Sequence, residues 1–272
     1  IIRPAQTAGR FVLGLGLFLS GAMVEAATYS MTPGDSWNAA LAQLQPGDTL
    51  LLQDGTYSPI SIDCTANARN GTASAPITVK AEHERQAWLN SDGSVAALEI
   101  RNCAYWTMEG LRGSSADNLS GYSSILDVIQ STNLTFRRLL LHRTNQAVNT
   151  DPGYYGEKKN LHAMWFGYSQ DILVEESELY DFHRHGYSIY YSDRVTLRRN
   201  YAFPRGSATS AGEGLALAVY PGSSNVVENN ILNAAYVLGI NTTVNNQLYG
   251  NIIVGFVNGS AIGDDWYGSA HL

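Results

Sequence analysis

The strongest constraint on the fold is a repeat in the second half of the sequence. Each unit has two inward apolar positions, a polar pair, a small polar or apolar residue and another apolar residue. The second inward position is occupied in successive units by Met108, Phe136, Val174, Leu197, Val227 and Leu248. The shorter intervals describe a coil of about 22 residues, and the longer ones carry insertions. Because such a coil cannot bury its apolar side alone, the repeat predicts stacked coils whose strands pair in parallel sheets.

A second position, three residues later, becomes polar in the later units. Its occupants are Ser177, Asn200, Asn230 and Asn251. Stacked at one inward turn, each amide can donate to a carbonyl of the coil above and accept from the coil below, which satisfies backbone groups outside the ladders. Such a series is hard to explain in a sandwich or a barrel. The sequence therefore predicts an all-β, right-handed, single-stranded parallel β-helix.

The two ends of the predicted solenoid differ. A helix over 36–44, capped by Asp35 or Ser36, has one apolar face and is followed by a buried strand over 49–52. We expect this helix to cap a β-helix domain spanning 28–272. At the other end the chain stops after 270–272 with no closing element, although a solenoid needs its last coil covered. The pattern predicts that C-terminal coils are missing.

The first 26 residues have the pattern of an export signal. Arg3 and Arg10 precede an apolar run over 11–18, and Val24-Glu25-Ala26 supplies small residues for cleavage. The alternative, a membrane anchor, suits the run poorly because it is short and glycine-rich. We therefore expect a signal peptide over 1–26 and a secreted protein, periplasmic or extracellular, with no membrane association after cleavage.

Charge and cysteine content limit the partners and the compartment. The net charge of −7 argues against general binding of nucleic acid or anionic membranes. Any binding of an acidic polymer must then depend on a local cluster of basic residues. Cys64 and Cys103 fit an oxidising compartment and a single disulfide, with two buried thiols as the alternative.

Several motifs resemble a known family. They are Gln45-Pro46-Gly47-Asp48-Thr49, Asp54-Gly55-Thr56-Tyr57, the segment 71–79 and the later stretch 223–230. The first three are similar to the capped start of pectate-lyase-like β-helix proteins, and most similar to the alginate lyase and chondroitinase-B group. The resemblance implies the β-helix fold and a polysaccharide ligand. It covers most of the chain beyond the signal.

The insertions fall at one turn of successive coils, over 114–124, 142–162, 180–186, 203–214 and 233–236. In repeat proteins such a face usually binds the ligand. The same turn gathers basic residues: His142, Arg143, Lys158, Lys159, His162, His183, Arg184, His185 and Arg205. In an acidic protein this cluster predicts a site for an anionic ligand. The alternative is that each is an ordinary solvated turn residue.

A lyase acting on a polyanion needs a clamp for the uronate carboxylate, a base for the neighbouring C–H and an acid for the leaving oxygen. Candidate clamps are Arg143, Arg184 and Arg205, because a guanidinium binds a planar carboxylate through two hydrogen bonds. Candidate bases are His183, His185 and Lys158, and candidate acids are Tyr154 and Tyr155. Lys159 and His162 complete the predicted binding surface. His185 is equally interpreted as a structural histidine, since it adjoins a strand.

Two aromatic residues are candidates for stacking on sugar rings. Trp165 and Tyr190 face outward if Met164, Phe166 and Ile189 point into the core. The alternative is that a loop covers them and they pack there.

The family's catalytic residues are not matched. In that group a Lys stretch follows calcium-binding acidic residues, and an Arg stretch follows one coil later. Here Tyr220-Pro221-Gly222 and Leu238-Gly239-Ile240-Asn241 stand at those positions. The group's mechanism is therefore not transferred. Polygalacturonase-like motifs at 149–151, 184–186 and 264–265 occur in the wrong order and are interpreted as chance matches.

No motif indicates a metal cofactor with certainty. Calcium is possible through Glu213, Asp151 or Glu157, but no dense set of oxygen ligands appears. The sequence predicts a monomer that binds an acidic polysaccharide and cleaves it by β-elimination. The alternatives are a non-catalytic surface or adhesion module and a glycoside hydrolase or uronate epimerase.

Overall fold

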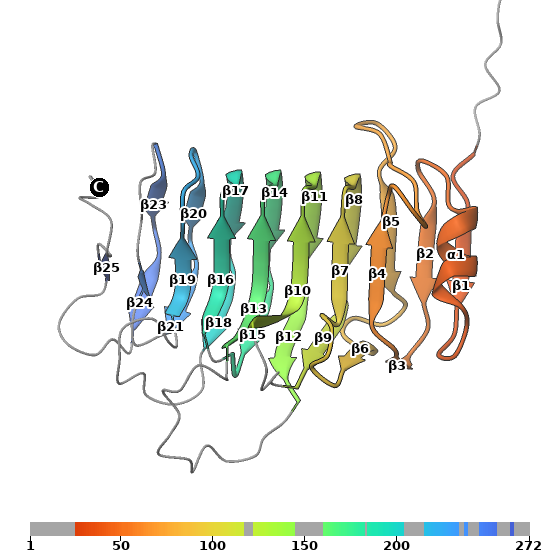
Figure 1. The fold of residues 1–272 in the computed structure, drawn as a ribbon, viewed down its shortest axis with the longest axis horizontal. Helices are drawn as coiled ribbons and strands as arrows, with labels where there is room; N and C mark the ends of the chain where they lie inside the picture. Colours follow the sequence, from red (N-terminus) through yellow and green to blue (C-terminus); the bar gives the residue numbers. More distant parts are fainter. Residues whose placement is uncertain are drawn as a thin grey trace, which may run out of the picture.

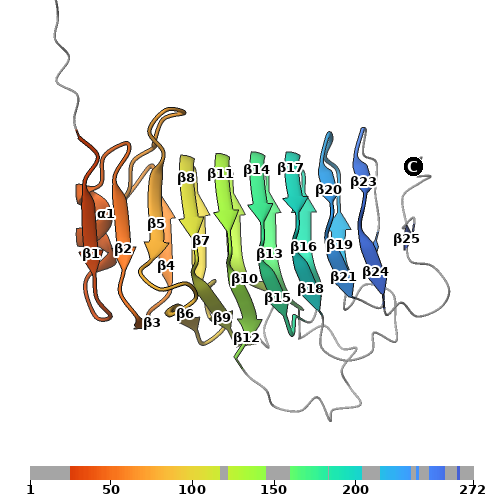
Figure 2. The ribbon, with the colours of Figure 1, turned by 180° about the vertical axis from the view of Figure 1, so that it is seen from behind.

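The computed structural model describes residues 25–116, 122–144, 160–182, 184–203, 215–233, 237–238, 245–254 and 262–263. Three all-parallel sheets, which we name A, B and C, run the length of the molecule (Figures 1 and 2). One strand from each sheet in turn makes one coil. The prediction of an all-β parallel β-helix is confirmed.

Sheet A pairs nine strands in chain order. They are β1 (Thr28–Met31), β2 (Thr49–Leu52), β5 (Ile77–Ala81), β8 (Ala104–Glu109), β11 (Thr132–Arg137), β14 (Gln170–Glu175), β17 (Asp193–Arg198), β20 (Val226–Glu228) and β23 (Gln247–Tyr249). Phe136 faces Met108 on one side and Val174 on the other, and the series continues through Leu197 and Val227 to Leu248. The predicted register of the repeat is therefore correct.

Sheets B and C complete each coil. Sheet B contains β3 (Gly55–Tyr57), β6 (Ala87–Ser91), β9 (Arg112–Ser115), β12 (Leu140–Arg143), β15 (Glu178–Tyr180), β18 (Tyr201–Phe203), β21 (Ile231–Asn233) and β24 (Ile252–Val254). Sheet C contains β4 (Ile60–Asp63), β7 (Leu98–Arg101), β10 (Tyr122–Ile129), β13 (Asn160–Gly167), β16 (His185–Tyr190) and β19 (Leu215–Val219). A last parallel pair joins β22 (Val237–Leu238) to β25 (Ile262–Gly263).

The helix α1 (Trp37–Gln43) lies at the N-terminal end of the solenoid, beside β1 and β2 (Figure 1). The Ser36 hydroxyl accepts a hydrogen bond from the Ala39 amide, so Ser36 is the N-cap. Asp35 instead accepts from Thr32. Leu41 and Leu44 are fully buried, which shows the apolar face of the helix covering the first coil.

The predicted amide series forms at the turn from sheet A to sheet B. The Asn200 Oδ1 accepts from the Ser177 amide, and its Nδ2 donates to the Val174 carbonyl. Asn230 and Asn251 repeat this pattern on the next two coils. The bonds from each amide to the backbone both go to the preceding coil, so the expectation of one bond above and one below is wrong for them; Asn230 Nδ2 in addition donates to Asn251 Oδ1 on the following coil. The reason is geometric: the orphan N–H and C=O at this turn belong to the same neighbouring coil.

A serine ladder that the sequence did not reveal lies at the turn from sheet C to sheet A. The hydroxyl of Ser131 accepts from the Cys103 amide, that of Ser169 from the Ser131 amide, and that of Ser192 from the Ser169 amide. All three serines are buried. These bonds fix the corner where the strands of sheet C end.

Charged side chains on the outer face of sheet A pair with one another. Glu175 lies between Arg137 and Arg198 in the register and forms ion pairs with both. Glu109 also forms ion pairs, with Lys80 and with Arg138. The charges of this face are thus largely neutralised within the sheet.

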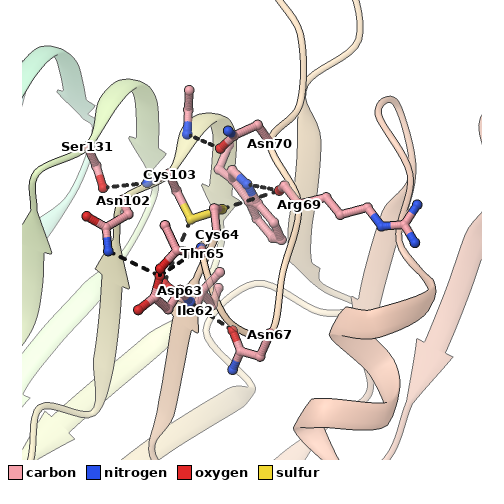
Figure 3. The surroundings of a disulfide bond; sticks show 12 residues. Ile62, Asp63, Cys64, Thr65, Asn67, Arg69, Asn70, Asn102, Cys103 and Ser131 are labelled. Carbon is pink, nitrogen blue, oxygen red and sulfur yellow. Dashed lines mark hydrogen bonds between the residues drawn. A yellow bond between two sulfur atoms is a disulfide. The ribbon is translucent and has the colours of Figure 1, made fainter.

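Cys64 and Cys103 form a disulfide, with a Cα–Cα distance of 5.0 Å (Figure 3). The disulfide prediction is confirmed and the alternative of two buried thiols is rejected. Cys64 begins the segment that leads from β4 to β5, and polar contacts hold that segment on its neighbours. The Trp106 indole donates to the Arg69 carbonyl, and the Ala104 amide donates to the Asn70 side chain.

Four of the insertions join a strand of sheet B to a strand of sheet C, as the repeat predicts. The fifth leads from β21 to β22, which pairs with β25 in a separate two-stranded sheet. Their predicted bounds were too wide, because the connections reduce to 116–121, 144–159, 181–184 and 204–214. Arg143 ends β12, His162 lies within β13, and His185 begins β16. These three basic residues are therefore strand residues and not part of solvated turns. The sequence could not show this because ladder pairing with the next coil extends each strand.

Candidate functional site

A cavity of about 550 Å³ lies on the outer face of sheet C. Its walls come from three successive strands, β10, β13 and β16, and from the residue that follows β19. The lining residues are Ser124, Asp127, His162, Trp165, Arg184, Ser188, Tyr190 and Tyr220. The connections 144–159 and 181–184 enter at the N-terminal ends of β13 and β16, so the cavity begins where the insertions end.

Strand alternation explains why these side chains share one face. Met164, Phe166 and Ile189 are fully buried in the core. The residues that alternate with them along β13 and β16 point outward. Parallel pairing aligns these outward residues in rows across the coils. Asp127, Trp165 and Ser188 make one such row. The predicted outward orientation of Trp165 and Tyr190 is therefore correct.

Trp165 lies flat on the sheet. A side chain at Gly167 would collide with the six-membered ring of its indole, so this glycine makes room for the ring. The indole stacks with Tyr190, with centroids 6.0 Å apart and planes at 29°. Tyr220 meets Tyr190 edge to face at 5.6 Å. The cavity thus has an aromatic wall of the kind that packs on the apolar face of a sugar ring.

Asp127 is the acidic group among the described residues that line the cavity. Within the described residues its Oδ1 atom is buried and has no hydrogen-bond partner. Burial raises the pKa of this carboxyl to about 6, and the charge of Glu99 acts in the same direction. The hydrogen bond from Ser124 and the charge of Arg101 oppose the rise. The charge of Asp127 therefore changes close to neutral pH.

Two histidines pack together beside the cavity. The rings of His162 and His185 meet edge to face at 4.8 Å, and both side chains are buried. Burial, followed by the charge of Arg184, lowers the pKa of His162 to about 3. Burial, His162 and Arg184 lower the pKa of His185 well below its ordinary value. Both imidazoles are neutral at physiological pH, and only His162 lines the cavity.

Arg184 supplies positive charge to the cavity lining. Its backbone amide donates to the Leu161 carbonyl at 3.1 Å, which anchors the start of the β16 coil against β13. Arg143, the other described clamp candidate, is only 3% exposed and lies at the end of β12 in register with Ser115. Among the described lining residues, Arg184 alone carries a guanidinium.

His142 faces a different hollow, on the outer face of sheet B. Its Nε2 accepts a hydrogen bond from Arg112, whose guanidinium lies 4.2 Å from the centre of the Trp88 ring. The basic cluster that the sequence predicted is thus divided between two sheets. The chain changes direction between sheet B and sheet C. Basic residues on either side of this turn, such as His142 in β12 and His162 in β13, therefore lie on different faces of the β-helix.

No family model and no curated protein matches the sequence. The structure is similar to the pectate lyase Pel9A, at 14% identity over 87% of this chain and 79% of that one, with a TM-score of 0.47. It is also similar to a mannuronic acid specific family 6 polysaccharide lyase from human gut microbiota, at 16% identity over 82% and 59%, with a TM-score of 0.47. An alginate lyase from Paenibacillus sp. str. FPU-7 shares 18% identity over 85% and 99%, with a TM-score of 0.37.

The three all-parallel sheets and the asparagine ladder decide the fold. The chain is a parallel β-helix. Within this β-helix the candidate cavity lies on the sheet that follows the long insertions. No helix among the described residues is long and apolar enough to cross a membrane.

The structure brings together some of the predicted site residues. Arg184, His162, Trp165 and Tyr190 line the cavity, while Arg143 and His185 are buried outside its lining. The remaining predicted residues lie outside the described part of the chain: His183, Lys158, Lys159, Arg205, Tyr154 and Tyr155. Their roles remain predictions.

Sequence reasoning missed Asp127, Ser124, Ser188 and Tyr220. Asp127 carried a usable signal, because it is an acidic residue between the buried Leu126 and Val128. Its importance comes from the strand two coils later, whose Tyr190 closes the same cavity. That proximity spans more than 60 residues and has no local signature.

Calcium does not suit the described lining of this cavity. A Ca²⁺ ion takes six to eight oxygen ligands, and Asp127 is the lone carboxylate among those residues. The possible ligands proposed from the sequence, Glu213, Asp151 and Glu157, lie outside the described residues. Asp54, Glu82 and His83 form an exposed cluster on the first coils, away from the strands that line the cavity.

Proposed function

We propose that the sheet C cavity binds an acidic polysaccharide and cleaves it by β-elimination. One observation carries this proposal. Arg184 and the buried carboxyl of Asp127 line the same aromatic-walled cavity. A clamp for an anion and a group that exchanges a proton near neutral pH are two of the three parts that such a reaction requires.

Binding would combine charge and stacking. The guanidinium of Arg184 neutralises the uronate carboxylate, which makes the hydrogen on the neighbouring carbon more acidic. Trp165 and Tyr190 pack against the apolar faces of the sugar rings. The acidic net charge of the chain makes this local cation necessary for a polyanion to bind.

Asp127 is the proposed base. With a pKa of about 6 it is ionised at neutral pH and only slightly stabilised as the anion, so it accepts a proton readily. It removes the proton from the carbon beside the uronate carboxylate, the electron pair forms a carbon–carbon double bond, and the glycosidic C–O bond on the next carbon breaks. The leaving oxygen then takes a proton.

Tyr190 is the proposed donor of that proton. Burial and the neighbouring Tyr168 and Tyr191 raise the pKa of its phenol, so it holds its proton at neutral pH. His162 is too weakly basic for the first step, because its pKa is about 3. As a neutral imidazole on the cavity wall it serves to orient the substrate by hydrogen bonding.

A glycoside hydrolase is a second candidate, and the same carboxyl favours it. A buried aspartic acid with a raised pKa can protonate a glycosidic oxygen directly. A hydrolase also needs a second carboxylate near the scissile bond. Among the described lining residues there is none, which is why elimination ranks first.

The test is a panel of polysaccharides that includes alginate, polygalacturonate and neutral glycans, with two readouts for each. Elimination produces an unsaturated uronate that absorbs in the ultraviolet, together with new reducing ends. Hydrolysis produces reducing ends without that absorbance. Binding without either product would support the non-catalytic alternative, and no binding to any glycan would overturn the proposal.

We also propose that the protein is exported, as its N-terminal pattern predicts. The disulfide between Cys64 and Cys103 supports this, because disulfides persist in oxidising compartments and are rare in the cytosol. Fractionation of producing cells would test it. Recovery of the protein in the cytosol with both thiols free would contradict it.

A further inference from the structure

Tyr168 and Tyr191 form an exposed aromatic pair next to the cavity. Their rings stack with centroids 5.5 Å apart and planes at 11°. Tyr168 is 58% exposed and Tyr191 is 49% exposed. Exposed, paired aromatic rings are unusual on a sheet corner, because burial of such rings against the core would normally be favourable.

The pair is continuous with the cavity through one residue. Tyr190 lines the cavity, and it also meets Tyr168 edge to face at 5.8 Å and Tyr191 at 4.7 Å. Tyr168 follows the last residue of β13, and Tyr191 follows the last residue of β16. The pair therefore lies at the C-terminal ends of these strands, whereas the insertions enter at their N-terminal ends.

The backbone of this corner gives no reason for tyrosine. Both residues have a left-handed conformation, with φ of 53° for Tyr168 and 46° for Tyr191. The same turn position of the two preceding coils has the same conformation and carries Asn102 and Gln130. Bulky side chains are disfavoured at positive φ, and polar ones such as asparagine are favoured there. Tyrosine replaces the polar residue on the two coils that contribute Trp165 and Tyr190 to the cavity.

We propose that Tyr168 and Tyr191 form an outer subsite for the glycan that occupies the cavity. A chain bound against Trp165 and Tyr190 would continue past Tyr190 and place a further sugar ring on this pair. The chain would then run roughly along β13 and β16, away from the insertions. This subsite rests on the proposed function, since it extends the same ligand beyond the same cavity.

Two substitutions isolate the effect of the rings. The variant with Tyr168→Asn and Tyr191→Gln gives this corner the kinds of residue that the preceding coils carry, so it should fold with an unchanged or slightly higher Tm. Tyr249→Ala is the matched control, because Tyr249 is also 49% exposed but lies at the end of sheet A.

The measurement is binding of alginate and polygalacturonate oligomers of increasing length by calorimetry. For short oligomers that fill only the cavity, the double variant should match the wild-type protein. For oligomers long enough to pass Tyr190, it should bind about tenfold more weakly, as expected for the loss of ring stacking. Tyr249→Ala should behave as wild type at every length.

The outcomes separate the two proposals. If the wild-type protein binds no oligomer of either polymer, the proposed substrate class fails. If it binds and gains affinity with length, but the double variant gains as much, the outer subsite is overturned while the cavity stands. An equal loss at all lengths would also overturn it, because the tyrosines would then act by supporting Tyr190.

Discussion

Asp127 and Trp165 face each other in the parallel pair of β10 and β13. The carboxyl thus lies beside a large apolar ring, and Glu99 occupies the position facing it on the other side. Desolvation and the nearby negative charge together disfavour ionisation. This row places a carboxylate whose ionisation is disfavoured by its surroundings at the floor of the cavity. Groups with strongly shifted pKa values tend to cluster at functional sites.

The first prediction concerns stability. The pKa of Asp127 is raised from 3.8 to about 6 in the folded protein. The folded state therefore binds the proton more tightly, and its stability falls as the pH rises from about 4 through about 6. Asp127→Asn should be more stable than wild type at pH 7.5, by up to about 3 kcal/mol. The difference should shrink toward pH 4 in urea unfolding curves. A variant that is less stable at neutral pH would contradict the buried-charge interpretation.

The second prediction concerns the pH dependence of cleavage. If Asp127 is the base, kcat/KM should rise as the pH increases through about 6, because the ionised form is active. Asp127→Asn should lose most of the activity together with that limb. A limb that falls through the same pH would mean that the protonated form is active, and would favour the hydrolase. A pH profile without a change in kcat/KM near pH 6 would show that Asp127 takes no part in proton transfer.

The third prediction concerns Arg184. Its removal in Arg184→Ala should lower kcat/KM by about 10²-fold, since a positive charge near the developing carbanion is lost. The Tm should change little, because a partly exposed side chain at a strand start supports little packing. Arg194→Ala is a suitable control, because Arg194 pairs with Asp171 on sheet A. A lowered Tm with an unchanged kcat/KM of the folded variant would make Arg184 structural.

The fourth prediction concerns the disulfide. Cys64 and Cys103 are separated by 39 residues, so removal of the cross-link should cost about 4 kcal/mol on the chain-entropy estimate. Cys64→Ala with Cys103→Ser is the variant of choice, because serine is the residue of the buried ladder on the following coils. Denaturant unfolding would measure the cost. Titration of the unfolded wild-type protein should find no free thiol unless a reductant is added.

Much of the fold was predictable because its determinants repeat. The spacing from Phe136 to Val174 and Leu197 contains insertions of unequal length, yet each coil restores the same inward positions. A residue that must fill the same place in every coil leaves a visible pattern. The serine ladder escaped notice because Ser131, Ser169 and Ser192 look like ordinary turn residues, and their role appears only when the coils are stacked.

The residues that line the cavity were predicted in part. The outward alternation in β13 and β16 identified Trp165 and Tyr190, and the basic character of the turn identified Arg184. The strands proved longer than expected, which moved Arg143 and His185 into buried positions. Strand length depends on pairing with neighbouring coils, and that information is not local.

By itself the sequence determined the coil, its register and the turn that carries the insertions. The reason is that apolar residues recur at the same inward positions of every coil. The tertiary structure alone decided which side chains meet. Stacking at the spacing of parallel strands put Asp127, Trp165 and Ser188 in one row and turned His142 toward another sheet. It also set the pKa of Asp127, because desolvation and the charge of Glu99 depend on neighbours that the chain brings together only when it is wound.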